Sequence, residues 1–268
     1  MPRTVMEVLK ALPRTNCGEC GRPTCLSFAT GVIKEGEDLA RCPYLSPAAQ
    51  AMAGDIQSQQ EKGIGRRRES LAIALEALQE KVAPLDFAAL APGLGARAGR
   101  EGDREYVDLP YFGQEVRVFK DQVRYPEGGA ANPWDAILLY NYLASQGNSE
   151  PTGTWITFQS LPNSVSKTKT LKRLEAELAG HFAGKGRELS AKARRLAGRP
   201  AEAAGDADLK LAFAPLPRVP VLLLFWESDP EEDFPAQAHF LFDGNVGDYL
   251  DLESLLFLVE QLSERLMA

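Results

Sequence analysis

No cysteine occurs after residue 42 of this 268-residue chain, and only two histidines are present in all. Residues 43–268 therefore lack the thiolates that bind soft metals and hold little imidazole for acid–base work. His181 lies beside the apolar stripe of a predicted helix, and His239 alternates along a predicted strand. Catalysis by histidine needs a positioned partner, and neither stretch supplies one, so both are interpreted as structural residues.

Catalytic and nucleotide-binding signatures are also missing. The sequence contains no Gly-x-Ser-x-Gly elbow, no His-Glu-x-x-His pair and no phosphate-binding loop. The glycines of 63–65 and 93–99 follow no predicted strand and lack the spacing of a dinucleotide fingerprint. We therefore predict no catalytic residues, and we favour an electron carrier or accessory protein over an enzyme.

Long apolar runs are absent too. No segment approaches the ~20 apolar residues that span a bilayer. The N-terminal Met-Pro-Arg-Thr lacks the apolar core of a signal peptide. These absences predict a cytoplasmic protein without membrane insertion, and the 44% apolar and 25% charged residues are typical of a soluble globular chain.

Basic residues are scarce at one end of the chain. Residues 219–268 hold 1 basic and 11 acidic groups, which argues against nucleic acid as a partner. Residues 167–199 hold 10 basic and 3 acidic groups, interpreted as a solvated helix face or as a surface that docks an acidic partner or the chain's own acidic end. The acidic loop 227–233 lacks the glycine and terminal glutamate of a calcium loop, so it is interpreted as solvated.

The most informative feature that is present is a group of four cysteines near the N-terminus. Their spacing is Cys-x2-Cys-x4-Cys-x16-Cys, formed by Cys17, Cys20, Cys25 and Cys42. Such a set can hold an iron–sulfur cluster, bind zinc or pair as two disulfides. Disulfides require an oxidising compartment, and zinc sites usually place their ligands in two separate close pairs. Three ligands close together and one distant ligand favour a [4Fe-4S] cluster, with zinc as the alternative.

The sequence around these thiols also carries a family resemblance. Residues 12–25 read Leu-Pro-Arg-Thr-Asn-Cys-Gly-Glu-Cys-Gly-Arg-Pro-Thr-Cys, and Cys42-Pro43 follow after a predicted helix. Residues 1–50 resemble the small [4Fe-4S] module of the corrinoid/iron–sulfur protein large subunit and of the cluster-bearing subunit of the Rnf electron-transport complex. The resemblance implies that the four cysteines are the ligands of a [4Fe-4S] cluster.

A thiolate-held cluster of this kind transfers single electrons and needs no further catalytic residues. We therefore predict a soluble iron–sulfur protein that passes electrons to a redox partner protein in anaerobic metabolism. A second hypothesis is an auxiliary role in corrinoid-dependent methyl transfer, with a corrinoid protein as partner, and it depends on the resemblance alone. A third is a binding or sensor protein whose cluster is structural.

Hydrophobic periodicity predicts an α+β fold, in which a small helical iron–sulfur module precedes a larger mixed α+β domain. We place the boundary near residue 63, where a glycine- and arginine-rich segment is interpreted as a hinge. The predicted domains are a cluster-binding module with a trailing helix over 1–62 and a domain of unknown function over 63–268. Predicted helices cover 4–12, 24–34, 47–62, 69–82, 134–146, 167–199 and 252–266, and predicted strands cover 106–109, 114–119, 154–158, 219–226 and 238–243.

The larger domain carries a resemblance of its own. Residues 111–114, 137–143, 151–156 and 240–243 resemble an uncharacterised domain family of anaerobic microbes that often follows this cluster module. The resemblance supports the domain layout and implies no activity. The three tryptophans, Trp134, Trp155 and Trp226, lie in apolar runs and are predicted to be core residues.

Overall fold

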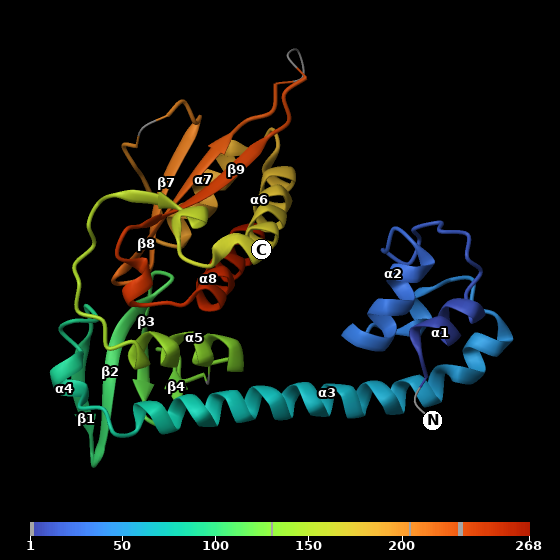
Figure 1. The fold of residues 1–268 in the computed structure, drawn as a ribbon, viewed down its shortest axis with the longest axis horizontal. Coiled ribbons are helices and arrows are strands. Elements are labelled where there is room, and N and C mark those ends of the chain that lie inside the picture. The colour runs from blue at the N-terminus through green and yellow to red at the C-terminus, as the bar shows by residue number, and fades with distance from the viewer. Residues whose placement is uncertain (1–2, 130, 204, 230–232) are drawn as a thin grey trace. The chain divides into compact units, whose positions relative to one another are not determined.

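The computed structural model describes residues 3–129, 131–203, 205–229 and 233–268. The chain divides into two compact units, Met1–Ala74 and Leu75–Ala268 (Figure 1). Helix α3 (Pro47–Val82) contributes residues to both units. Each unit has its own cluster of buried apolar side chains, so each is described by itself.

The first unit is helical. Helix α1 (Val5–Ala11) begins at Thr4, whose side chain accepts from the Glu7 backbone, and the Glu7 carboxylate accepts from the Thr4 N–H, so the two residues form a capping box. Helix α2 (Cys25–Thr30) begins at a second capping residue, Thr24, and continues as a π-helical turn over Gly31–Glu35. A short 3-10 helix (Leu39–Arg41) then leads to Cys42.

Helix α3 differs from its prediction. The sequence predicted two helices separated by a hinge at 63–68, whereas the structure has one helix of 36 residues. A glycine inside a helix costs only about 1 kcal/mol relative to alanine, and the residues around Gly63 and Gly65 are mostly good helix formers. The compact units divide after Ala74. The predicted domain boundary near residue 63 lies within the same helix and remains a proposal.

A chain that starts at residue 66 is expected to fold without iron. It contains no cysteine, and roughly 200 residues suffice for a hydrophobic core. Circular dichroism and thermal unfolding in the presence of a chelator would test this. A chain that starts at residue 97 is the matched control, because it lacks the core residues Leu78, Val82, Phe87 and Leu94 and is expected to unfold at a lower temperature. An unfolded 66–268 chain would contradict the two-domain proposal.

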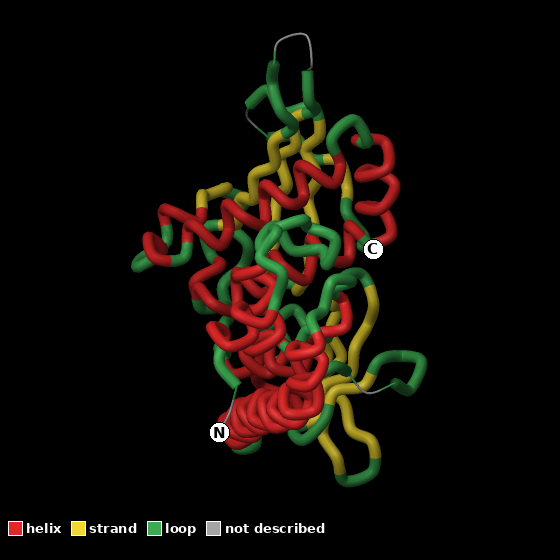
Figure 2. The backbone as a smooth tube through the Cα atoms, turned by 90° about the vertical axis from the view of Figure 1, so that its right-hand side faces the viewer, coloured by secondary structure: helices red, strands yellow, loops and turns green. Residues whose placement is uncertain are grey.

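Within its described residues, the second unit contains two antiparallel sheets, and Figure 2 shows their strands in yellow. The first sheet has the order β1-β2-β3-β4. Phe112 and Gly113 connect β2 to β3 with φ angles of 48° and 82°, the left-handed geometry of a tight hairpin turn. The predicted strands at 106–109 and 114–119 are therefore present and form a hairpin, whose two-residue loop is shorter than the four residues between the predicted strands. The four strands are β1 (Arg97–Glu101), β2 (Arg104–Tyr111), β3 (Gln114–Phe119) and β4 (Val123–Arg124).

The second sheet has the order β5-β9-β8-β7-β6, and all its neighbours are antiparallel. Its central strand β8 is nearly all buried, as its continuous apolar run predicted. Strand β9 pairs with β8 so that Phe240 lies opposite Leu223. The predicted strands at 219–226 and 238–243 are confirmed. The five strands are β5 (Trp155–Thr157), β6 (Arg199–Pro200), β7 (Leu209–Leu216), β8 (Val219–Trp226) and β9 (Gln237–Asp243).

Helices cover and connect these sheets. Helix α6 packs against β9 and α8, and helix α7 packs against β7 and α8 (Figure 1). The fold class is α+β, as predicted. The helices are α4 (Phe87–Leu90), α5 (Pro133–Ala144), α6 (Thr168–Phe182), α7 (Gly186–Arg195) and α8 (Leu252–Met267), with 3-10 turns at Phe158–Ser160, Ser164–Ser166 and Val246–Asp248.

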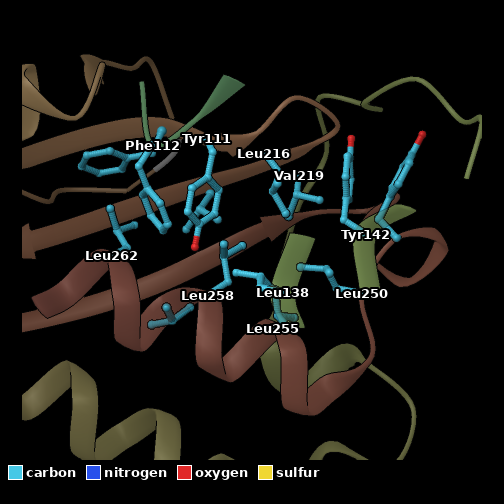
Figure 3. Close-up of a cluster of buried hydrophobic side chains, with 14 of the residues drawn as sticks. Tyr111, Phe112, Leu138, Tyr142, Leu216, Val219, Leu250, Leu255, Leu258 and Leu262 are labelled. Carbon is cyan, nitrogen blue, oxygen red and sulfur yellow. The ribbon is translucent and has the colours of Figure 1, made fainter. Parts of the chain in front are cut away.

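Helix α8 contributes one buried face to the core. Figure 3 shows Leu255, Leu258 and Leu262 on one side of this helix, pointing towards the strands. Leu216 and Val219 meet them from the end of β7 and the start of β8. All five side chains are fully buried. The helix predicted over 252–266 is therefore present, and its apolar face joins it to the sheet.

The basic stretch uses its apolar side for packing. Leu171, Leu174 and Leu178 of α6 are buried, because they repeat at helical spacing and face β9 and α8. Lys167 forms an ion pair with Glu253 at the start of α8, which links the basic stretch to the acidic end. Lys167 therefore fits one of the interpretations above, in which the basic stretch packs against the chain's own acidic end.

A buried carboxylate joins four segments of the second unit. Asp135, 1% exposed, accepts hydrogen bonds from the hydroxyls of Tyr111 (2.6 Å) and Tyr125 (2.7 Å) and from the Asn132 amide (2.7 Å). Arg265 of α8 donates to both of its oxygens, at 3.1 and 3.2 Å. Burial, followed by the charge of Asp135 and the hydrogen bond to it, raises the pKa of Tyr111 far above its usual value. Both tyrosines therefore act as hydrogen-bond donors to the Asp135 carboxylate.

A second buried carboxylate, Asp243 at the end of β9, holds the loop before β5. It accepts from the backbone and hydroxyl of Thr152 (2.8 and 2.9 Å), from Gly153 N–H (2.7 Å) and from Asn245 N–H (3.1 Å). Burial alone would raise the pKa of Asp243, but these hydrogen bonds to the charged form outweigh it and lower the pKa below its usual 3.8.

This shift gives a pH dependence with a defined sign. The pKa of Asp243 is lower in the folded state, so its stabilising contribution is present above pH 3.8 and is lost as the pH falls through the folded pKa. Asp243→Asn is expected to destabilise the fold at neutral pH and to flatten the fall in unfolding free energy below pH 3.8. Urea unfolding across this pH range measures both. The exposed Asp248, changed to Asn, is the control, and equal slopes for the two variants would contradict the assignment.

Candidate metal centre

Three of the four cysteines lie on the loop between α1 and the first turn of α2. Cys17 and Cys20 belong to the loop, and Cys25 is the first residue of the helix. Asn16 has a left-handed backbone (φ 51°), and its side-chain oxygen accepts the Cys25 N–H at 2.9 Å. Because Asn16 directly precedes Cys17, this bond holds the start of the loop next to Cys25 at its end.

Two glycines shape the same loop. Gly18 and Gly21 both have left-handed backbones, with φ of 77° and 83°, and Gly21 N–H donates to Gly18 O at 2.8 Å. A Cβ atom at Gly21 would lie 2.7 Å from the guanidinium of Arg41. The left-handed backbone favours glycine at position 21, and the guanidinium of Arg41 lies against it.

The fourth cysteine comes from another segment. Cys42 ends the 3-10 helix, and its N–H donates to Leu39 O at 3.2 Å. Cys20, Cys25 and Cys42 are 9%, 8% and 6% exposed and share one core cluster with Phe28 of α2, whereas Cys17 is exposed. The structure thus brings three of the predicted ligands into one apolar cluster and leaves the fourth at its surface. None of the four forms a disulfide.

Tyr44 connects the two cysteine-bearing segments. Its hydroxyl donates to both oxygens of Glu19, at 2.9 and 3.0 Å. The hydrogen bond to Glu19 and the charge of that carboxylate raise the pKa of Tyr44, and smaller contributions come from burial and from Cys17 and Cys42. Sequence reasoning missed both Tyr44 and the Asn16 contact, because each pairing depends on how the loop folds. The placement of an Asn before the first thiol was the only local signal.

The donor set is compatible with an iron–sulfur cluster. Four free thiols, three of them in an apolar environment and all on tightly turned or capped backbone, are the ligands that such clusters use. Within the described residues, no three histidine, cysteine, aspartate or glutamate side chains gather closely enough to hold a single metal ion. The assignment of the four cysteines as ligands remains a proposal.

The other groups weighed from the sequence lie elsewhere. His239 Nδ1 is 3.5 Å from Glu175, a carboxylate that also accepts the Phe240 N–H at 2.9 Å and whose pKa is raised chiefly by burial. Glu227 of the acidic loop accepts from the backbone of Gly184 and Gly186 at the start of α7, so this residue caps a helix. Glu231 and Glu232, from the same predicted loop, lie outside the described residues.

Comparison with known proteins finds relatives of the N-terminal segment. Over 49 residues the chain is 53% identical to the corrinoid/iron-sulfur protein large subunit of Moorella thermoacetica, covering 18% of this chain and 11% of the relative. Over 46 residues it is 46% identical to the acetyl-CoA decarbonylase/synthase complex subunit gamma of Methanothermobacter thermautotrophicus, covering 17% and 10%. The chain therefore spans about a tenth of the length of these curated relatives.

Family models match both parts of the chain. Residues 12–44 match a model described as "Putative Fe-S cluster", so the resemblance of this segment to iron–sulfur proteins is confirmed. No solved structure matches the chain. Among the described residues, no helix has the length and apolar character needed to cross a membrane. A further model matches residues 86–265, more than half of the chain, and the chain therefore belongs to the family described as "Domain of unknown function (DUF3786)".

Proposed function

We propose that the protein binds one [4Fe-4S] cluster through Cys17, Cys20, Cys25 and Cys42 and passes single electrons to a partner protein in anaerobic metabolism. The observation that carries the proposal is the set of four free thiols, on a loop closed by Asn16 and on a second segment beside it. Bound there, the cluster would supply one-electron chemistry. The α+β domain would then serve as the docking module.

The protein's own residues support this role in three ways. The buried Cys20, Cys25 and Cys42 place their sulfurs among apolar side chains, and limited solvent exposure is one of the factors that set a cluster's potential. Cys17 reaches the surface, which offers a route for electrons to a docked partner. The second unit carries no cysteine, so the proposed redox function lies in the first unit.

An auxiliary role in corrinoid-dependent methyl transfer is the second candidate, favoured by the likeness to the corrinoid/iron-sulfur protein large subunit. Because that likeness covers 18% of the chain, it concerns the cysteine-bearing segment alone. A corrinoid bound by this protein would add its own bands to the visible spectrum. Protein that is colourless after removal of iron, and that retains no added corrinoid on gel filtration, would rule this candidate out.

Purification without oxygen tests the proposal directly. The protein is expected to be brown and to contain about four irons per chain, the stoichiometry of a cubane cluster. Its EPR spectrum should show one reduced centre after addition of a physiological electron donor. Colourless protein with one zinc would contradict the cluster assignment. A cluster that physiological donors cannot reduce would favour a structural role, the third hypothesis, over electron transfer.

A further inference from the structure

One carboxylate lies between the two segments that carry the cysteines. Glu37 follows the turn after α2, and its side chain is 14% exposed. Arg22, which lies between Cys20 and Cys25, donates from Nε to Glu37 Oε1 at 2.7 Å, and its Nη2 contacts the same oxygen. Arg41, directly before Cys42, has its Nη1 3.8 Å from Glu37 Oε2. The two oxygens of Glu37 therefore face one arginine from each segment.

The backbone around Glu37 is shaped to allow these contacts. Its N–H donates to Gly31 O at 3.2 Å, and a Cβ atom at Gly31 would lie 2.8 Å from the Glu37 carboxylate carbon. Gly36 before it has a left-handed backbone (φ 77°), which reverses the chain after the π-helical turn. At the other side, Arg41 lies against Gly21 of the ligand loop. Glycines at positions 21, 31 and 36 thus permit a compact Arg22–Glu37–Arg41 triad.

The triad also puts charged residues on both segments that carry the cysteines. A [4Fe-4S] cluster with four thiolates gains one further negative charge on reduction, so nearby positive charge favours the reduced form. Arg22 and Arg41 contribute two positive charges and Glu37 one negative charge. The carboxylate is largely shielded from solvent, so screening by water and salt is weaker than for an exposed pair.

From these contacts we infer that Glu37 is a positioning residue of the proposed cluster site. It holds the loop of Cys17, Cys20 and Cys25 against the segment of Cys42, and through its charge it lowers the reduction potential of the bound cluster. The effect on the reduction potential, the electrostatic part of the inference, rests on the proposed function. The holding together of the two segments, the positioning part, applies to the metal-free chain as well.

Three variants of the full-length chain separate these effects. Glu37→Ala removes the link, Glu37→Gln keeps an oxygen that can accept from Arg22 but removes the charge, and Arg22→Gln removes one positive charge. Asp55→Asn is the matched control: Asp55 also pairs with an arginine, Arg3 (Nε to Oδ2, 3.1 Å), in the same unit, but the pair joins no two cysteine-bearing segments.

The first measurement is made on metal-free protein. Alkylation of the buried Cys20, Cys25 and Cys42, followed by mass spectrometry, is expected to be several-fold faster in Glu37→Ala than in the unmodified chain and unchanged in Asp55→Asn. Equal rates in the unmodified chain, Glu37→Ala and Asp55→Asn would overturn the positioning part. Because this experiment involves no iron, it remains decisive even if the protein proves to bind no cluster and the proposed function fails.

The second measurement is the reduction potential of the iron-loaded protein. We expect a more positive potential for Glu37→Gln, a more negative potential for Arg22→Gln and no shift for Asp55→Asn. If the substitutions only loosened the structure of the site, the reduction potentials of Glu37→Gln and Arg22→Gln would shift in the same direction. Shifts of the same sign, or none, would overturn the electrostatic part.

Discussion

Replacing any one of Cys17, Cys20, Cys25 or Cys42 with alanine is expected to remove most of the iron from the protein. Each thiolate of a cubane binds a different iron, so no neighbouring ligand can take over the vacant position. Loss of even an outer contact commonly weakens metal binding about 10- to 100-fold, and loss of a ligand should exceed this. Iron content and the visible spectrum after anaerobic purification measure the effect.

A neighbouring substitution supplies the control. Leu26→Ala changes the residue after Cys25, in the same turn of α2, and its side chain is half exposed, so its iron content should match that of the unmodified chain. Cys17 provides an internal comparison, since it is the exposed thiol of the four. If all four alanine variants keep their iron, the cluster is bound elsewhere and the proposed ligands are wrong.

Asp135→Ala is expected to destabilise the second unit by about 3–5 kcal/mol, the usual cost of breaking a buried charged pair. The substitution leaves the hydroxyls of Tyr111 and Tyr125 and part of the Arg265 guanidinium without their acceptor. Each buried donor without a partner costs about 1–3 kcal/mol, and water reaches this site poorly because Asp135 is 1% exposed. Urea unfolding followed by tryptophan fluorescence measures the loss.

The exposed Asp121 provides a matched comparison. It also pairs with an arginine, Arg104, but both side chains are largely exposed. Exposed pairs contribute about 0–1 kcal/mol, so Asp121→Ala should change stability little. Similar losses in the two variants would show that burial does not govern the contribution of Asp135. Asp135→Asn should fall between them, because an amide keeps the size of the carboxylate but not its charge.

The segments that were predicted well have a hydrophobic pattern that clearly favours one type of secondary structure. The apolar run of β8 fits a strand buried on both faces, and the stripe of α8 fits a helix on a sheet. Strand β7 was not predicted, although its burial alternates over 210–214, because the prolines at 215 and 217 are typical of a loop. The turn between β7 and β8 uses Pro217 and Arg218, so the prolines mark the end of a strand.

Some errors have a tertiary cause. Trp134 was predicted to be a core residue, but it is 46% exposed and its ring lies beside that of Phe257, 5.5 Å away. Trp134 lies on the same face of α5 as Ile137 and Asn141, which are only partly buried, whereas the other residues of 135–143 are buried. When a helix is apolar nearly all round, the local pattern cannot show which of its faces will lie at the surface.

The sequence predicted which cysteines make up the candidate site, but it did not predict the contacts that hold their segments together. Cysteine spacing identified the four thiols as a set, because thiols in such numbers are rare and their clustering is visible in the sequence. The pairing of Glu37 with Arg22 spans 15 residues and depends on the chain reversal at Gly36. Charged residues are common, so nothing in the sequence marks these two as partners.

The short outer strands of the second sheet have a consequence for behaviour at high concentration. Strands β5 and β6 have three and two residues, and β6 is an arginine followed by a proline, which cannot donate to a ladder. Such edges offer few open hydrogen-bonding groups to a second molecule, whereas the apolar run of β8 would be an effective template for cross-β aggregation. Because β7 and β9 flank β8 on both sides, that run becomes available only when the sheet itself opens.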